Sequence, residues 1–172
     1  WTMLGYYKAD DKTAEVFEGK YYKTGDTGRF DKQGNLIITG RIKDTFKTAK
    51  GKFVVPVPLE HHFSTNPFIE QIMVTGIGLT QPIALISLNT QIKFNKKEIK
   101  ASLFKTLAHV NSLSEKHEQI KQLVVFKQAW AEDSDFFTPT MKLKRHIIDA
   151  QYKESYFEWE ASKQDIIWID GA

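Results

Sequence analysis

The 172-residue sequence has no cysteine, only five prolines, only three arginines and no long apolar run. The absence of cysteine excludes disulfide frameworks, thiolate zinc sites and cysteine nucleophiles. No segment approaches the roughly 18 consecutive apolar residues that a transmembrane helix needs. Residues 1–4 also lack the basic and apolar segments of a signal peptide. Because the first residue is Trp1 and not methionine, we expect the sequence to come from a longer protein.

The charge balance gives little support for a nucleic-acid partner. The chain has 24 Lys and Arg residues against 21 Asp and Glu residues, a net charge of +3, and all but three of the basic residues are lysine. A nucleic-acid-binding face is usually clustered, strongly basic and rich in arginine. An apolar share of 41% and an aromatic share of 13% are typical of a globular domain. This composition excludes a chain that is disordered over its whole length.

Several short apolar runs predict β-strands. The Gly34-Asn35 turn before a β-branched run predicts a hairpin with a strand at 36–40. Two further runs, 69–75 and 82–88, are predicted to pair with each other, and 123–126 is also a predicted strand. A last apolar run, 166–169, closes the apolar pattern of the chain. The turn between the paired runs contains Gly76-Ile77-Gly78, which lacks the rest of a dinucleotide-binding fingerprint.

Helical periodicity is clearest between residues 95 and 110. There the apolar residues recur every three or four positions, at Ile99, Leu103, Leu107 and Val110. A second helix is predicted from about Lys144, with Ile148, Tyr152 and Tyr156 on one stripe. A short helix is predicted after Pro58, with Leu59, His62 and Phe63 on one face, because two nearby prolines exclude a helix interior there.

Strands and helices therefore interleave after residue 41, whereas residues 1–40 are rich in Gly, Thr and Asp and predict strand and turn. The predicted fold class is α+β. The composition changes near residues 41–43, so we expect one domain over 1–42 and another over 43–172.

Three segments, 22–31, 40–60 and 137–145, occur in an order and spacing that resemble the adenylate-forming acyl-CoA synthetases. The sequence Thr-Pro-Thr-Met-Lys-Leu-Lys-Arg at 138–145 is similar to the long-chain fatty acyl branch. The resemblance implies that residues 1–42 are the last β-structure of a large N-terminal adenylation domain. Residues 43–172 would be the mobile C-terminal lid domain, and the rest of the large domain would be its missing partner.

The resemblance also implies a reaction. A fatty acid is activated with ATP to an acyl adenylate, pyrophosphate leaves, and the acyl group passes to coenzyme A, with Mg²⁺ as a further cofactor. Most of the nucleotide pocket would lie in the missing domain, so we expect this chain alone to be inactive. A cytoplasmic location is expected, and peripheral membrane contact stays open.

Two alternatives accompany this interpretation. One is a ligase that uses an acyl carrier protein, or another adenylate-forming enzyme, because the acyl pocket that would separate them is absent. The other is a non-catalytic basic module that binds nucleic acid or a partner protein.

The resemblance assigns the catalytic role to Lys142. A lysine ammonium is a compact charge with three donors, suited to bridging the substrate carboxylate and an α-phosphate oxygen as negative charge redistributes. In a chain so rich in lysine, Lys142 by itself would be interpreted as a solvated surface charge. Its assignment depends on the motif around it.

The resemblance assigns nucleotide contacts to Asp26 and Arg41. An ionised carboxylate can accept both ribose hydroxyls, although a turn aspartate such as Asp26 can also bond its own backbone. Arg41 would contact the ribose or a phosphate, with a surface salt bridge as the alternative. Lys43 matches the hinge, a backbone position that absorbs the rotation of the lid.

Lys47 and Gly51 are the remaining candidates. Lys47 would contact the adenylate, and Gly51 would allow the backbone to approach the pantetheine arm of coenzyme A. The alternative for Lys47, Lys50 and Lys52 is a solvated basic loop. His61 and His62 do not suggest a metal site, because neighbouring helical residues point in different directions, and no metal ligands are predicted.

Overall fold

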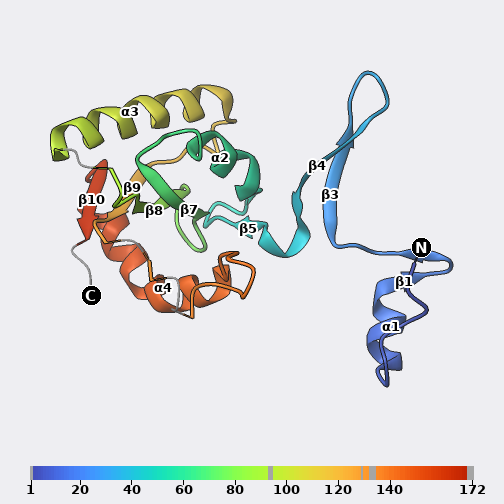
Figure 1. Cartoon of the computed structure of the whole chain (residues 1–172). Coiled ribbons are helices and arrows are strands. Elements are labelled where there is room, and N and C mark those ends of the chain that lie inside the picture. Colours follow the sequence, from blue (N-terminus) through green and yellow to red (C-terminus); the bar gives the residue numbers. More distant parts are fainter. Residues whose placement is uncertain (1, 93–94, 129, 132–134, 170–172) are drawn as a thin grey trace. The chain divides into compact units, whose positions relative to one another are not determined.

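The structure is a computed structural model that describes residues 2–92, 95–128, 130–131 and 135–169. The chain divides into two compact units, residues 1–43 and 44–172. Each unit is described by itself below, with the elements labelled as in Figure 1.

The first unit contains a short helix and two hairpins. Its elements are α1 (Asp10–Val16), β1 (Phe17–Glu18), β2 (Tyr21–Tyr22), β3 (Asp26–Phe30) and β4 (Leu36–Arg41). Strands β1 and β2 are antiparallel, as are β3 and β4. The hairpin predicted around Gly34 is confirmed. Gly34 adopts a φ of 85°, and Asp31 Oδ1 accepts hydrogen bonds from the backbone N–H groups of Gln33 and Asn35.

Helix α1 differs from the predicted strand and turn structure of this region. It begins with Asp10 and Asp11, which interact favourably with the positive end of the helix dipole. None of its residues is buried, so the helix has no apolar stripe from which periodicity could predict it.

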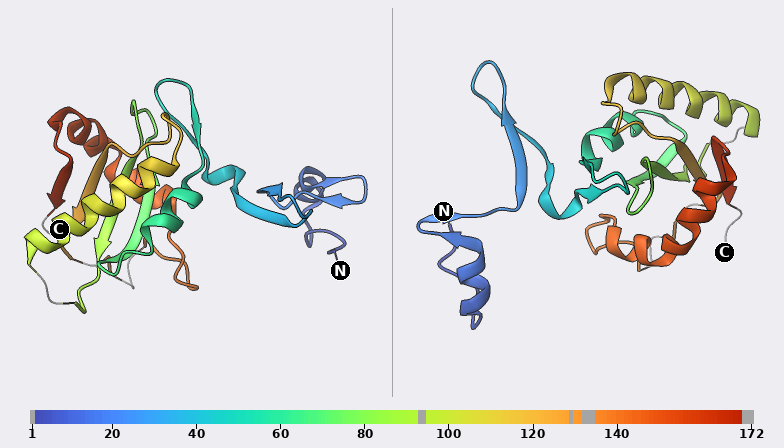
Figure 2. Two further views of the ribbon diagram at one scale, coloured as in Figure 1. Left: turned by 90° about the horizontal axis from the view of Figure 1, so that it is seen from above. Right: turned by 180° about the vertical axis from the view of Figure 1, so that it is seen from behind.

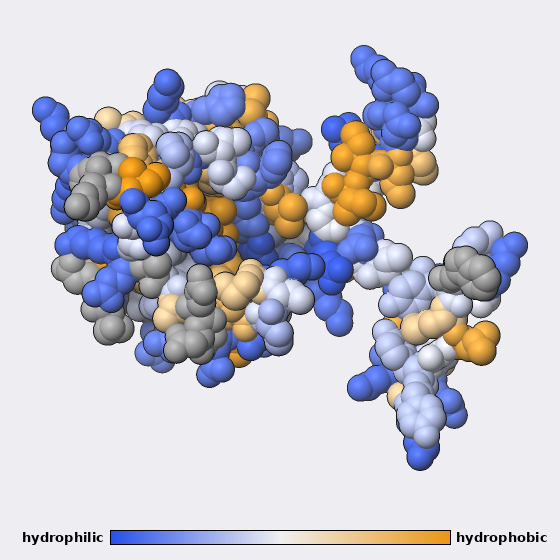
Figure 3. All heavy atoms as spheres, in the orientation of Figure 1, coloured by the Kyte–Doolittle hydropathy of each residue, from blue (hydrophilic) through white to orange (hydrophobic). Residues whose placement is uncertain are grey.

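The β3–β4 hairpin carries apolar side chains that are exposed to solvent. Phe30, Leu36 and Ile38 are 73%, 59% and 59% exposed. Figure 3 shows hydrophobic surface, coloured orange, on this hairpin.

The 3₁₀ turn η1 (Ile42–Asp44) contains the point where the two units divide, and the second unit contains the remaining elements. They are β5 (Phe46–Lys47), β6 (Phe53–Val54), α2 (Pro56–Phe63), β7 (Ile69–Thr75), β8 (Ile83–Leu88), α3 (Lys96–Leu113), β9 (Gln122–Phe126), α4 (Arg145–Ser162) and β10 (Ile166–Ile169). The predicted strands and the two long helices are confirmed, and so is the α+β class.

A four-stranded sheet forms the centre of this unit, in the order β10-β9-β8-β7. Strands β7 and β8 are antiparallel, whereas β8, β9 and β10 are parallel to one another. Parallel neighbours need a crossover connection, and here α3 connects β8 to β9 while α4 connects β9 to β10. Figure 2 shows these two helices on opposite faces of the sheet.

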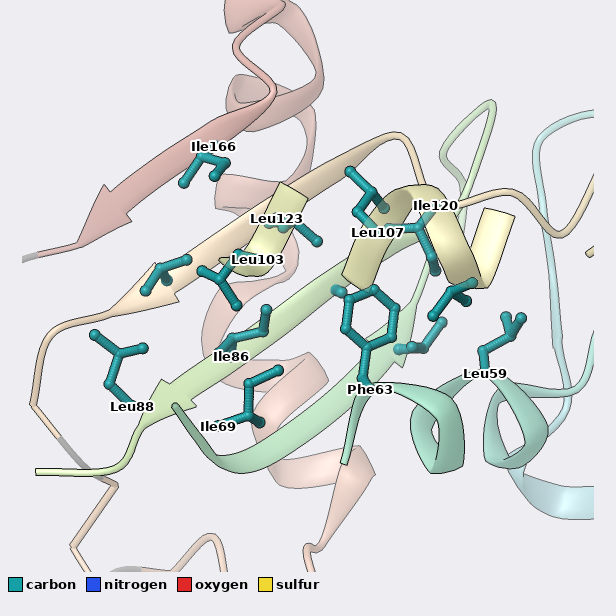
Figure 4. Packing of buried hydrophobic residues seen from close by; sticks show 14 of the residues in the cluster. Leu59, Phe63, Ile69, Ile86, Leu88, Leu103, Leu107, Ile120, Leu123 and Ile166 are labelled. Carbon is teal, nitrogen blue, oxygen red and sulfur yellow. The ribbon is translucent and has the colours of Figure 1, made fainter. Parts of the chain in front are cut away.

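Strand residues alternate between the two faces, as the period of two requires. On one face, Ile86 and Leu123 pack with Phe63 of α2 and with Leu103 and Leu107 of α3, as Figure 4 shows. On the other face a second cluster includes Leu85, Val124 and, from α4, Ile148, Tyr156 and Trp159. The sheet is therefore covered on both sides, which explains why β8 and β9 are buried along their whole length.

Helix α3 confirms its predicted core face, because Ile99, Leu103, Leu107 and Val110 are all buried. The side chain of Asn95 caps its first turn and accepts a hydrogen bond from the Glu98 N–H at 2.9 Å.

Helix α2 begins at Pro56, three residues before the start predicted after Pro58. The prediction was wrong because both prolines fall in the first turn, where the backbone N–H groups have no intrahelical partner in any case. Leu59 and Phe63 are buried as predicted, and His62 is half-buried.

The aromatic residues of α4 mostly pack into the core. Tyr156 and Trp159 are buried, and the Tyr152 ring packs at a tilt against Phe126 with ring centres 5.1 Å apart. Phe157 is 53% exposed and lies outside this cluster.

None of the helices in the described part of the chain is long and apolar enough to cross a membrane.

Candidate active site

Lys142 lies in a tight turn directly before α4. An isolated β-bridge between Phe137 and Leu143 closes the base of the turn. Within the turn, the Thr138 N–H donates to the Lys142 carbonyl at 2.9 Å, and the Lys142 N–H donates to the Thr138 hydroxyl at 3.1 Å. Residues 137–143 are called the lysine turn below.

Hydrogen bonds fix the backbone of the lysine turn, while Lys142 is left exposed to solvent. Met141 has a φ of 59°, which is uncommon for a residue other than glycine and is stabilised here by the bond from its N–H to the Thr138 carbonyl. The Lys142 residue itself is exposed. A charged side chain is thus presented to its surroundings from a constrained backbone, as a group that must meet a bound anion requires.

Arg145, the first residue of α4, forms an ion-pair network with residues distant in sequence. Its guanidinium makes a two-pronged pair with the Glu60 carboxylate of α2, in which Nη1 donates to Oε1 at 2.8 Å and Nη2 donates to Oε2. Its Nε lies 3.8 Å from Asp44 Oδ2. The Glu60 Oε1 atom also accepts the Val74 N–H at 2.7 Å.

The pKa of Arg145 depends on its burial and on the carboxylates around it. Burial by itself lowers the pKa of Arg145, whereas the hydrogen bonds and the charge of Glu60 raise it. With the further charges of Asp44 and Asp149, the pKa of Arg145 lies above its ordinary value. The guanidinium is therefore held charged and in place.

A second polar contact fastens α4 to β7 one turn further along. Asp149 Oδ1 accepts hydrogen bonds from the Thr75 hydroxyl at 2.9 Å and the Tyr156 hydroxyl at 2.8 Å. Burial and the nearby Asp149 carboxylate raise the pKa of Tyr156 far above its ordinary value, so the phenol stays protonated and donates.

In the first unit, the structure brings Asp26 and Arg41 together. They are opposite each other in the β3–β4 register, and Arg41 Nε lies 3.0 Å from Asp26 Oδ1. The expectation that Asp26 sits in a turn was wrong. It is the first strand residue, and Gly25 before it, with a φ of 76°, makes the bend.

Lys43 is an exposed residue in the middle of η1, next to the point where the two units divide. Lys47 and Gly51 lie on the β5–β6 hairpin, a separate turn of the second unit from the one that carries Lys142. Lys47 Nζ is 5.6 Å from the centre of the Phe53 ring.

The backbone conformation at position 51 favours glycine. Gly51 has a φ of 75°, and its N–H donates to the Thr48 carbonyl at 2.9 Å to close the hairpin. A Cβ at this position would meet Lys47 Cε at 3.6 Å, which is an ordinary contact.

A pocket of about 410 Å³ lies beside this hairpin. The residues that line it are of polar or charged types: Thr48, Lys50, Lys52, Thr80, Gln81, Glu115, Lys116 and His117. We call it the basic pocket. Three lysines around one opening favour an anionic ligand.

Sequence reasoning missed the roles of Asp44 and Glu60. Both lie in the motif segment 40–60, but their partner Arg145 is 85 residues beyond Glu60. The scarcity of arginine was the one available signal, since guanidinium groups are preferred in buried ion pairs. Among the described residues, no group of three or more His, Asp or Glu side chains is arranged to hold a metal ion.

Solved structures with similar folds define the class. The chain matches the adenylation domain of a carboxylic acid reductase from Segniliparus rugosus, in complex with AMP and a carboxylic acid, with a TM-score of 0.75 and 23% identity. That match covers 94% of this chain and 27% of the other. The corresponding domain from Mycobacterium chelonae matches with a TM-score of 0.76 and 24% identity over 92% and 26% of the two chains. The fold is that of the adenylate-forming enzymes.

Residues 43–156 match the family model described as the AMP-binding enzyme C-terminal domain, and the chain belongs to that family. The resemblance stated from the sequence motifs is thereby confirmed.

Named relatives are fatty acid ligases. The long-chain-fatty-acid–CoA ligase FadD15 of Mycobacterium tuberculosis is 30% identical over 166 residues, which cover 86% of this chain and 28% of the relative. The palmitoyl-CoA ligase FUM16 of Gibberella moniliformis is 31% identical over 178 residues, with 92% and 26% covered. A long-chain-fatty-acid–[acyl-carrier-protein] ligase of Arabidopsis thaliana, AEE15, is 29% identical over 88% of this chain and 23% of its own length. The chain spans about a quarter of these relatives.

Proposed function

We propose that this chain is the C-terminal part of an enzyme that activates a fatty acid with ATP and transfers the acyl group to coenzyme A. Residues 1–42 would belong to the large adenylation domain and residues 43–172 to the lid domain, with the hinge at Lys43. The observation that carries the proposal is the lysine turn, which presents Lys142 inside the segment that matches the family.

In the proposed first step, a carboxylate oxygen of the fatty acid attacks the α-phosphorus of ATP, and the bond to the leaving pyrophosphate breaks. Lys142 stabilises the negative charge on the carboxylate and α-phosphate oxygens during this transfer. In the second step the sulfur of coenzyme A attacks the acyl carbon and AMP leaves. No metal-binding cluster occurs among the described residues, so Mg²⁺ is assigned no ligand here and would accompany the ATP phosphates.

The Asp26–Arg41 pair suits the ribose of the nucleotide. A carboxylate has about four lone-pair positions, so Asp26 can accept ribose hydroxyls while Arg41 Nε stays at 3.0 Å from its Oδ1 atom. The arginine would orient the carboxylate and place positive charge near the α-phosphate. Lys47 remains a proposed contact to the adenylate, from the exposed side of the β5–β6 hairpin.

The basic pocket is the proposed site for the phosphates of coenzyme A, and Gly51 lies on the hairpin that borders it. In the full-length enzyme, replacing Lys50 and Lys52 together with alanine is expected to raise the KM for coenzyme A about tenfold, because each exposed charge contributes up to about 1 kcal/mol. Acyl adenylate formation should stay within twofold of wild type. Exposed Lys153 on α4 provides the control, since Lys153→Ala should leave both values unchanged. An unchanged KM in the double variant would remove the basic pocket from the proposal.

The experiment that tests the proposed function measures both half-reactions of the full-length protein. We expect fatty-acid-dependent exchange of pyrophosphate into ATP, followed by acyl transfer to coenzyme A. Transfer to a phosphopantetheine-bearing acyl carrier protein instead would favour the alternative activity, which is that of the relative AEE15. Absence of exchange with any carboxylate, together with salt-dependent binding to nucleic acid, would support the non-catalytic module. We also propose a cytoplasmic location, with peripheral membrane contact to be tested by sedimentation with vesicles.

A further inference from the structure

The guanidinium of Arg145 joins three parts of the second unit. It pairs with Glu60 of α2, approaches the Val74 carbonyl of β7 at 3.5 Å, and faces Asp44, the residue that follows Lys43. We propose that Arg145 is a positioning residue for Lys142, and that Asp44, Arg145 and Glu60 brace the lysine turn against the segment next to the hinge. This inference rests on the proposed function.

The first step of the argument is the short connection between Arg145 and the lysine turn. Lys142 lies three residues before Arg145, and the intervening backbone is held by a bond from the Lys144 N–H to the Phe136 carbonyl at 2.7 Å. The bridge between Phe137 and Leu143 also joins the two sides of the turn. A shift of Arg145 therefore shifts the turn that carries Lys142.

The second step is that Glu60 provides a fixed anchor. Its side chain is only 12% exposed, both of its oxygens engage Arg145, and one of them also accepts the Val74 N–H. A two-pronged arginine–carboxylate pair fixes direction as well as distance. The start of α4 is thus tied to α2 and to the end of β7.

The third step concerns Asp44. Glu60 alone neutralises the guanidinium, so the nearby Asp44 is not needed to balance its charge. The Asp44 carboxylate instead links the network to the residue directly after the proposed hinge, at 3.8 Å from Arg145 Nε. Rotation at Lys43 would then carry Asp44, Arg145 and the lysine turn as one body.

The test compares the two half-reactions in the full-length enzyme. Arg145→Lys keeps the charge but loses the two-pronged geometry. It is expected to lower kcat for acyl adenylate formation about 10- to 100-fold with KM for ATP unchanged, because small misplacements of a reacting group have effects of this size. Thioester formation from supplied acyl adenylate should fall less than threefold.

A double variant gives the sharpest readout. If Arg145 acts through Lys142, Arg145→Lys should cause no further loss of adenylation when Lys142 is already alanine. Asp44→Asn serves as a milder variant if Arg145→Lys folds poorly, and a three- to tenfold loss of adenylation is expected from it.

The structural control is Asn66→Ala. Asn66 is a buried residue whose side chain donates to the hydroxyls of Ser102 and Thr106 on α3, in a polar network separate from the lysine turn. This variant should lose thermal stability without separating the two half-reactions. The positioning role is overturned if Arg145→Lys behaves in the same way, or if its effect multiplies with that of Lys142→Ala. If Lys142→Ala alone leaves adenylation intact, the proposed function itself fails.

Discussion

Acyl adenylate formation by the full-length enzyme is expected to fall on the order of 10²- to 10³-fold when Lys142 is replaced by alanine. The lost ammonium would otherwise stabilise the charge that develops between the carboxylate and the α-phosphate, a contribution of about 3 to 4 kcal/mol. Thioester formation from supplied acyl adenylate should change little, because that step no longer involves the α-phosphate transfer. Pyrophosphate exchange and acyl transfer measured separately make the distinction.

Two controls accompany this experiment. Lys153→Ala removes another exposed lysine, from the middle of α4, and should leave both half-reactions unchanged. Lys142→Arg retains the positive charge but replaces the compact ammonium with a planar fork, and it should restore only part of the lost rate. Unaffected adenylation in Lys142→Ala would show that the assignment from the motif is wrong.

Replacing Lys43 with proline is expected to lower the overall rate of acyl-CoA formation by about 100-fold or more. A hinge works through rotation of its backbone, and proline fixes φ near −65° while restricting the residue before it. One of the two half-reactions should survive and the other should be lost, because the lid could then reach only one of its two conformations. The separate half-reaction assays report which one survives.

Lys43→Ala is the matched variant for this prediction. It removes the exposed side chain but leaves φ and ψ free, so activity should stay within about threefold of wild type. If the alanine and proline variants lose activity equally, the Lys43 side chain acts directly and the backbone hinge at this position is contradicted.

The secondary structure of the second unit was largely predictable because its signals are local. Apolar spacing predicted α3, whose four core residues are all buried, and short apolar runs predicted β7, β8 and β9 of the sheet. Helix α1 was not predicted, because it buries no residue and so its sequence has no apolar periodicity. The start of α2 was predicted too late, because proline is favoured in the first turn of a helix and both prolines lie there.

Only part of the candidate site could be predicted from the sequence. Lys142, Asp26 and Arg41 were selected through their motifs, and their roles remain predictions. The contact between Asp26 and Arg41 was not predicted, since it depends on the register of β3 against β4. The pairing of Arg145 with Glu60 was equally hidden, because a separation of 85 residues carries no periodic signal.

The sequence by itself determined the class of fold, the core faces of the helices and the family to which the chain belongs, because these depend on local periodicity and on short motifs. The tertiary structure alone decided which charges meet. Arg145 reaches Glu60 and Asp44 only after the sheet has brought α2, the end of β7 and the start of α4 together. A buried ion pair of this kind forms when packing removes water around both partners and supplies the remaining hydrogen bonds, and no spacing along the chain encodes that event.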